Sequence, residues 1–263
     1  MRLRLCAACG VAAALRLAPA GAAQQPPADP HAVQPERPTV ATHAYTVAPG
    51  WVEIEAGAEL DHYSDGSAGA TAPVVVKIGL ARRLQLDLDG ALLRPPQGTA
   101  IGLGDLAVGL KVRVLAAAPL LGAVSLQPSL KLPTAPEGSG LGTGTTDVAL
   151  LLISSHDLGP VSMDLNMGYT RRSGSGARAP RSATLWTASF GGTAIGSVGW
   201  VAEVFGYPGT SGPAGQPPIV ALLAGPTLLA RAWLAFDAGV IVPLEGPQPR
   251  ALYAGTVWNV GRL

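Results

Sequence analysis

The chain has 263 residues, of which 48% are hydrophobic and only 13% are charged, and its formal net charge is +1. The charged share is about half of that in an ordinary globular protein, and the absence of basic runs excludes a nucleic-acid-binding protein. The longest uncharged stretches, such as 204–230, are interrupted by prolines, which argues against a membrane-spanning helix. A hydrophobic chain without hydrophobic helices favours a membrane β-barrel.

The first 23 residues have the pattern of a secretory signal peptide. Arg2 and Arg4 form its basic start, an apolar stretch covers 5–17, and small residues at 20–22 provide a cleavage site. Both cysteines, Cys6 and Cys9, lie within this segment. The mature chain therefore has no thiol, and neither a disulfide nor a cysteine-bound metal is expected.

Residues 24–50 are rich in proline and alanine, with pairs such as Pro26-Pro27 and the run 35–38. This composition is too poor in large apolar residues to build a core. We expect the segment to be a linker or a flexible arm in the periplasm.

From Trp51 onward, apolar and polar residues alternate one for one, as the five apolar and four acidic residues of 51–61 illustrate. This period places one kind of side chain on each face of a strand. The pattern predicts a closed antiparallel transmembrane β-barrel over 51–263. Its twelve expected strands are 51–61, 73–81, 84–93, 104–115, 121–132, 146–154, 160–170, 183–193, 198–207, 218–229, 232–242 and 251–262.

The connections between these strands alternate between short and long. Short periplasmic turns and long extracellular loops are typical of outer-membrane barrels, and an even strand count returns both ends of the barrel to the periplasm. Strands of 9–12 residues also match the thickness of the hydrocarbon layer when they are tilted.

Strand parity assigns each side chain to the lipid or to the lumen. The outward set is apolar: Val74, Val76, Ile78, Leu80, Leu84, Leu86, Leu88, Leu106, Val108, Leu110, Val112, Val114, Val161, Met163, Leu165, Met167, Trp186, Phe190, Trp200, Val204, Leu234, Phe236, Val240, Leu252, Trp258 and Val260. Segments 146–154 and 218–229 are apolar on both parities, so their register stays undetermined.

The inward set carries about eleven acids against about four bases. An acidic open lumen would favour cations or neutral polar solutes, whereas in a plugged interior the bases would pair with some of the acids; the sequence leaves both open. The residues expected to tune passage through the lumen are Lys77, Asp87, Asp89, Lys111, Arg113, Asp164, Glu203 and Asp237.

Two other functions remain open. A barrel hydrolase would need a site near His62, which has Ser64 and Asp65 close in sequence, while His156 falls in an expected periplasmic turn. A non-conducting structural barrel is the second alternative. No cofactor or metal is expected, because the glycine-rich stretch 140–147 lacks the lysine of a phosphate-binding loop and the acids near Gly66 match no calcium-binding spacing.

Several stretches in chain order resemble a known family. They are the hairpin 76–86, the strand start 102–106 followed by Lys111, the loop Leu130-Lys131-Leu132-Pro133-Thr134 with Gly142-Thr143-Gly144, and the segments Asp237-Ala238-Gly239 and Ala254-Gly255-Thr256. These resemble the putative MetA-pathway of phenol degradation family, over roughly 36–263. The resemblance implies an outer-membrane barrel and transport of small compounds, aromatic ones among them, and it supplies no catalytic residues.

The sequence therefore predicts an outer-membrane channel that passes small molecules through the barrel without covalent chemistry. Its expected partners are outer-membrane lipid and lipopolysaccharide, a small-molecule solute, and the barrel-assembly machinery during biogenesis.

Overall fold

A computed structural model describes residues 29–96, 101–136 and 138–263, and the expected signal peptide lies outside these residues. The described chain is all-β, without helices. Its strands are β1 (Trp51–His62), β2 (Ala68–Ala81), β3 (Leu84–Arg94), β4 (Gly102–Leu103), β5 (Leu106–Leu115), β6 (Ala123–Leu132), β7 (Asp147–Asp157), β8 (Val161–Arg172), β9 (Ser182–Ile195), β10 (Val198–Tyr207), β11 (Ile219–Arg231), β12 (Leu234–Glu245) and β13 (Arg250–Arg262).

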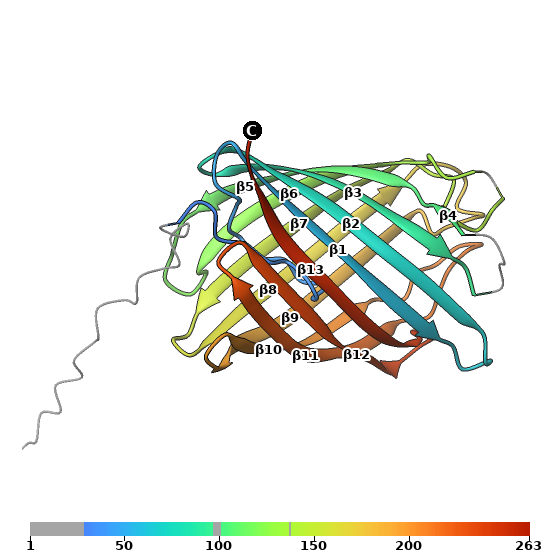
Figure 1. The fold of residues 1–263 in the computed structure, drawn as a ribbon. Coiled ribbons are helices and arrows are strands. Elements are labelled where there is room, and N and C mark those ends of the chain that lie inside the picture. Colours follow the sequence, from blue (N-terminus) through green and yellow to red (C-terminus); the bar gives the residue numbers. More distant parts are fainter. Residues whose placement is uncertain (1–28, 97–100, 137) are drawn as a thin grey trace, which may run out of the picture.

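Twelve of these strands form a closed antiparallel barrel (Figure 1). Each pairs with its neighbours in the chain, β1 pairs with β13, and β2 pairs with β3, so the sheet has no free edge among these twelve. The two-residue β4 pairs only with the end of β3 and lies outside the barrel wall proper. The predicted fold class is confirmed.

The expected division between lipid-facing and lumen-facing residues holds along the wall. None of the predicted outward side chains is buried, and many remain more than one-third exposed, such as Val74, Leu88 and Met167. The inward positions between them are polar and largely covered: Lys77, Gln85 and Lys111 are 0% exposed. The barrel thus presents an apolar belt to its surroundings and encloses its charges.

The structure also shows which side chains face the lumen in the two segments whose register the sequence leaves undetermined. In β7, Ile153 is buried in the lumen while Leu150 and Leu152 are exposed; in β11, Ala221 and Leu223 are buried while Leu222 is exposed. Pairing with a neighbouring strand that alternates clearly determines which side chains face the lumen. In β11, for example, Leu223 pairs with lumen-facing Glu203 of β10.

The alternation of connection lengths is weaker than predicted. Residues 63–67 and 246–249 are short because β1, β2, β12 and β13 extend into the expected long loops, whereas the β5–β6 turn spans 116–122. Strand pairing continues beyond the apolar belt, for example between His62 and Ala68. Pro128 and Pro226 lie within strands, but the β11–β12 pairing skips Pro226.

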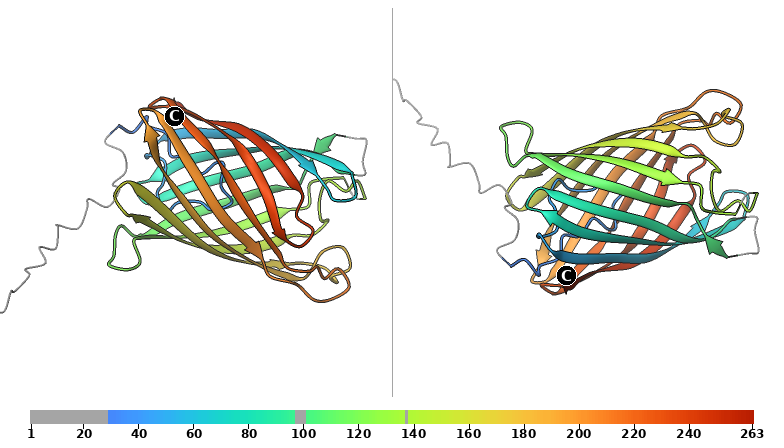
Figure 2. Two further views of the ribbon diagram at one scale, coloured as in Figure 1. Left: turned by 90° about the horizontal axis from the view of Figure 1, so that it is seen from below. Right: turned by 90° about the horizontal axis from the view of Figure 1, so that it is seen from above.

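The largest departure from the sequence analysis concerns residues 24–50. We expected a flexible periplasmic arm, yet the described part of it, residues 29–50, runs through the inside of the barrel (Figure 2). Ala44 and Val47 are at most 1% exposed. We call residues 29–50 the plug segment.

Candidate functional site: the plugged lumen

The plug segment enters and leaves the lumen at the short-turn end of the barrel, where β1 begins (Figures 1 and 2). At its entrance, the His31 ring lies between Trp51 and Trp233, with ring centroids 4.9 and 6.1 Å away, and its Nε2 is 3.0 Å from the Asn259 carbonyl oxygen. At its exit, the Gly50 amide donates to the Gly79 carbonyl. Both ends of the plug segment are therefore attached to the same rim.

Between these ends, the plug segment is irregular, so its backbone groups need partners outside regular secondary structure. Lumen-facing side chains supply them from around the wall. Acceptors for its amides include Glu53 (β1, from Gln34, 2.7 Å), Glu203 (β10, from Val40 and Ala41, 2.8 and 2.7 Å), Asn166 (β8, from Thr42, 2.7 Å), Ser155 (β7, from Ala44, 2.8 Å) and Gln85 (β3, from Val47, 2.7 Å).

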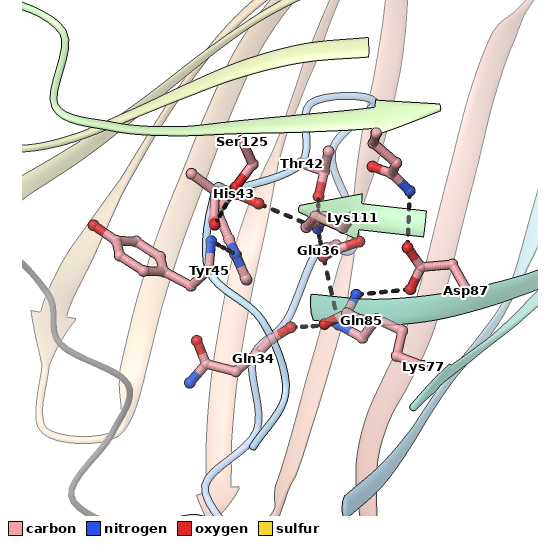
Figure 3. Close-up of polar contacts among 12 residues, drawn as sticks. Gln34, Glu36, Thr42, His43, Tyr45, Lys77, Gln85, Asp87, Lys111 and Ser125 are labelled. Carbon is pink, nitrogen blue, oxygen red and sulfur yellow. Dashed lines mark hydrogen bonds and ion pairs between the residues drawn. The ribbon is translucent and has the colours of Figure 1, made fainter. Parts of the chain in front are cut away.

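Two fully buried lysines hold the centre of the plug segment (Figure 3). The Lys77 ammonium lies 2.6 Å from carboxylate oxygens of both Glu53 and Glu55, and it donates to the Gln34 carbonyl. The Lys111 ammonium pairs with Glu36 and donates to the Thr42 hydroxyl (2.9 Å) and the His43 carbonyl (3.2 Å). Buried charges of this kind are tolerated only when they are paired and hydrogen-bonded.

Arg37 contacts the wall at β12, β13 and β1. Its guanidinium donates to both carboxylate oxygens of Asp237 at 3.2 and 3.3 Å. It lies against Gly57 and Gly255, which are paired residues of β1 and β13, and a Cβ at either position would collide with it. The two glycines thus form a notch that admits the arginine.

Gly79 marks a second close approach between wall and plug segment. A Cβ at this position would overlap the carbonyl oxygens of Ala48 and Val47. Only glycine lets these backbones lie so close, and this contact holds the plug segment against β2.

The lumen keeps open space on both sides of the plug segment. A cavity of about 260 Å³, the inner chamber, is lined by Arg37, Thr39, Asp164 and Asp237 among others. A cavity of about 370 Å³, the outer chamber, lies toward the long loops, and its lining includes Glu36 and Thr42 from the plug segment. One cavity therefore lies on each side of the plug segment.

All eight predicted lumen residues face inward, but the structure gives them different surroundings. Lys77, Lys111, Glu203 and Asp237 bind the plug segment. Asp87 accepts hydrogen bonds from Gln85 and Gln127, Asp164 accepts one from Ser155, and the Arg113 guanidinium lies 5.9 Å from the centre of the Tyr45 ring. Asp89 lines the outer chamber.

The sequence analysis missed the plug segment and the wall residues that hold it. Strand parity puts Glu53, Glu55 and Asn166 on the lumen face but gives no sign of what they bind, and Glu36 and Arg37 fall in the expected periplasmic arm. One signal was available: Glu36 and Arg37 form an adjacent charged pair in a proline-rich stretch whose only other charged residue is Asp29.

The residues of the hydrolase alternative do not come together. His62 is exposed at the end of β1, and Asp65 accepts hydrogen bonds from the amide and the hydroxyl of Ser67. His156 lies in β7 rather than in a turn, with its Nε2 2.8 Å from the Ser154 hydroxyl. Neither histidine forms a nucleophile–base–acid arrangement.

At the long-loop end, Asp105 organises the connection 133–146. It accepts hydrogen bonds from the Lys131 ammonium (2.7 Å) and from the amides of Thr143 (3.1 Å) and Ala135 (3.2 Å). Burial alone would raise the pKa of the Asp105 carboxyl, but these donors hold that pKa below its ordinary value of 3.8.

Two further kinds of site were sought in the described ranges. They contain no group of three or more histidine, cysteine, aspartate or glutamate side chains arranged to hold a metal ion. No helix there is long and apolar enough to span a membrane.

Comparison with solved structures identifies the class of fold. An outer membrane channel from Pseudomonas putida F1 superposes with a TM-score of 0.63 at 12% sequence identity, covering 82% of this chain and 97% of that one. The KdgM porin, solved in complex with disordered oligogalacturonate, superposes with a TM-score of 0.55 at 10% sequence identity, covering 79% of this chain and 98% of that one. The NanC porin superposes with a TM-score of 0.54 at 8% sequence identity, covering 79% of this chain and 98% of that one.

The chain therefore has the fold of outer-membrane channels and porins, and its closed wall and apolar belt place it in the outer membrane. No family model matches the chain. No curated protein sequence matches it either.

Proposed function

We propose that this protein is an outer-membrane channel for small molecules whose lumen is closed by its own N-terminal segment and opens when that segment moves. The observation that supports this proposal is the position of residues 29–50, which lie inside the lumen with a cavity on each side. Opening a continuous path requires the plug segment to leave at least part of its binding site.

The way in which the plug segment is held is compatible with such movement. It belongs to no strand, and its attachments are individual hydrogen bonds and ion pairs to side chains of the wall. The wall keeps its own backbone ladder without it. Displacement of the plug segment therefore leaves the sheet intact, although it exposes the paired charges of Lys77 and Lys111 to water.

The resemblance to the phenol-degradation family adds aromatic compounds as candidate solutes.

The test is single-channel recording of the mature chain, with a variant that weakens plug binding. Gly79→Ala places a methyl group against the Val47 and Ala48 carbonyls, while the strand itself tolerates alanine. We expect rare wide openings from the unmodified protein and more frequent wide openings from Gly79→Ala.

Gly109→Ala is the matched control. It also adds a lumen-facing methyl group to a strand glycine, but the nearest atom is the Gln127 side-chain nitrogen at 3.3 Å, and the plug segment is not among its close contacts. Identical recordings from both variants and the unmodified chain would count against a movable plug segment.

A further inference from the structure

The outer chamber has the size of a small-molecule binding site. Its volume is about 370 Å³, at the lower end of typical ligand pockets. Strands β3 and β5–β10 contribute to its lining, and Glu36 and Thr42 of the plug segment form part of its boundary. A solute arriving from the long-loop end meets this chamber before the plug segment.

One side of the chamber is aliphatic, which is unusual for the interior of a polar barrel. Leu151, Gly168 and Leu185 are neighbours in one row across β7, β8 and β9. The two leucines lie over Gly168, because a Cβ there would be 3.2 Å from the Leu151 side chain and 3.4 Å from that of Leu185. Ala149 and Ala183 extend this apolar surface.

The same chamber contains two side chains, Gln127 and Asp89, with acceptor oxygens that receive no hydrogen bond from the described part of the chain. The Gln127 amide nitrogen donates to Asp87 at 2.9 Å; because the Asp87 carboxylate can only accept, this bond fixes the amide orientation. The Gln127 Oε1 atom is then buried without a hydrogen-bond partner. Asp89 makes no hydrogen bond or ion pair with any residue that the structure describes.

The basic group in this lining is already engaged. Arg172 donates to Asp147 at 3.2 Å and to the Pro180 carbonyl at 3.0 Å. Lys111, the lysine beside Glu36, is fully buried among Glu36, Thr42 and the His43 carbonyl. The unpaired charge of the chamber is therefore negative, and it lies next to a hydrocarbon surface.

We propose that the outer chamber binds small organic cations, an apolar body lying on Leu151 and Leu185 and an ammonium group donating to Asp89 and to the Gln127 side-chain oxygen. This assignment deepens the proposed function, on which it rests, by naming the solute class. A carboxylate of the same shape is disfavoured, because it would bring negative charge next to Asp89 and Glu36, where the described lining offers no unpaired basic group.

The experiment is calorimetric titration of the refolded mature chain with phenethylammonium and, separately, with 3-phenylpropanoate. These probes share an aromatic body and differ in the charge of the head group. We expect saturable binding of the cation and none of the anion. Asp89→Asn should weaken cation binding about tenfold, as expected for removal of one charge partner in a partly screened site.

Asp157→Asn is the matched control, since it removes one carboxylate at the end of β7, outside the chamber lining. Gln127→Leu is a second probe that leaves the net charge unchanged and should also weaken binding. Equal binding of the anion, or equal effects of Asp89→Asn and Asp157→Asn, would overturn the assignment. So would unchanged cation binding in both Asp89→Asn and Gln127→Leu.

Conductance measured on the same preparations separates this assignment from the proposed function. A protein that conducts but does not bind phenethylammonium refutes the cation site and leaves the channel standing. A protein that binds the cation with the expected variant effects but never conducts supports the site and refutes the channel.

Discussion

At the scale of single residues, the buried lysines show why a charged lumen is stable here. Lys77 is 0% exposed, and its two carboxylate partners are at most 3% exposed. Taking such charges out of water costs several kcal/mol per ion, which only close pairing offsets. Removing the lysine alone would therefore leave two buried carboxylates without a cation, whereas the three charges together are tolerated.

Lys77→Met should destabilise the protein strongly, because it leaves Glu53 and Glu55 buried without a cation. Breaking a buried pair typically costs about 3–5 kcal/mol. The free energy of unfolding from denaturant titration in lipid vesicles measures the loss. The triple variant Lys77→Met, Glu53→Gln, Glu55→Gln removes the charges together, so we expect it to regain most of the lost stability; a triple variant as unstable as the single one would disprove the pairing argument.

The same residues show how far parity reasoning reaches. Alternation placed Lys77, Asp89 and Glu203 on the correct face, because one buried and one lipid-exposed face leave only one register for a strand. Alternation has no bearing on what a side chain meets across the lumen. That Glu203 receives two amides of the plug segment depends on a contact between residues about 160 positions apart.

At the scale of elements, the strands were predictable and the plug segment was not. Most strands in the wall carry a period of two, which the sequence displays directly, and the two that do not, β7 and β11, take their register from their neighbours. The plug segment has no period, and proline and alanine in it indicate only that it forms no core of its own. Its order is supplied by the wall, through partners such as Asn166 and Ser155 that look like ordinary lumen residues.

The long-loop connection 133–146 offers a test of order at this scale. Asp105→Asn removes the charge that holds Lys131 and the amides of Ala135 and Thr143. We expect the Thr143 and Ala135 amides to exchange with deuterium faster in this variant, since charge-assisted bonds are about twice as strong as neutral ones. Hydrogen exchange followed by mass spectrometry of this connection measures the effect.

The pH dependence of the same connection follows from the sign of the shift. The pKa of Asp105 is lowered in the folded protein, so its contribution is fully present above its ordinary value of 3.8 and is lost as the pH falls further. Exchange in the unmodified chain, corrected for intrinsic rates, should therefore be unchanged between about pH 7 and pH 5. A large rise within that range would mean that another group holds the connection.

At the scale of the whole molecule, the fold combines a closed barrel wall with a plug segment that is not part of the sheet. The closed ladder satisfies its own backbone groups, whereas the plug segment relies on side chains from β1, β3, β7, β8, β10 and β12. Because these contacts are spread around the circumference, the plug segment closes the lumen without being part of the wall.

This division of roles makes tethering the decisive test of gating. The Ser125 hydroxyl in β6 donates to the Ala44 carbonyl of the plug segment at 2.6 Å, so these two residues are neighbours across the boundary between plug and wall. A disulfide between cysteines at these positions would join the plug segment to the wall. The native cysteines, Cys6 and Cys9, precede residue 24, and a mature chain beginning there adds no other thiol. Oxidation of Ala44→Cys, Ser125→Cys should suppress wide openings in single-channel recordings, and a reductant should restore them. In each single-cysteine variant, neither the oxidant nor the reductant should change the frequency of wide openings. Wide openings that persist after complete cross-linking, verified by mass spectrometry, would show that solutes bypass a stationary plug segment.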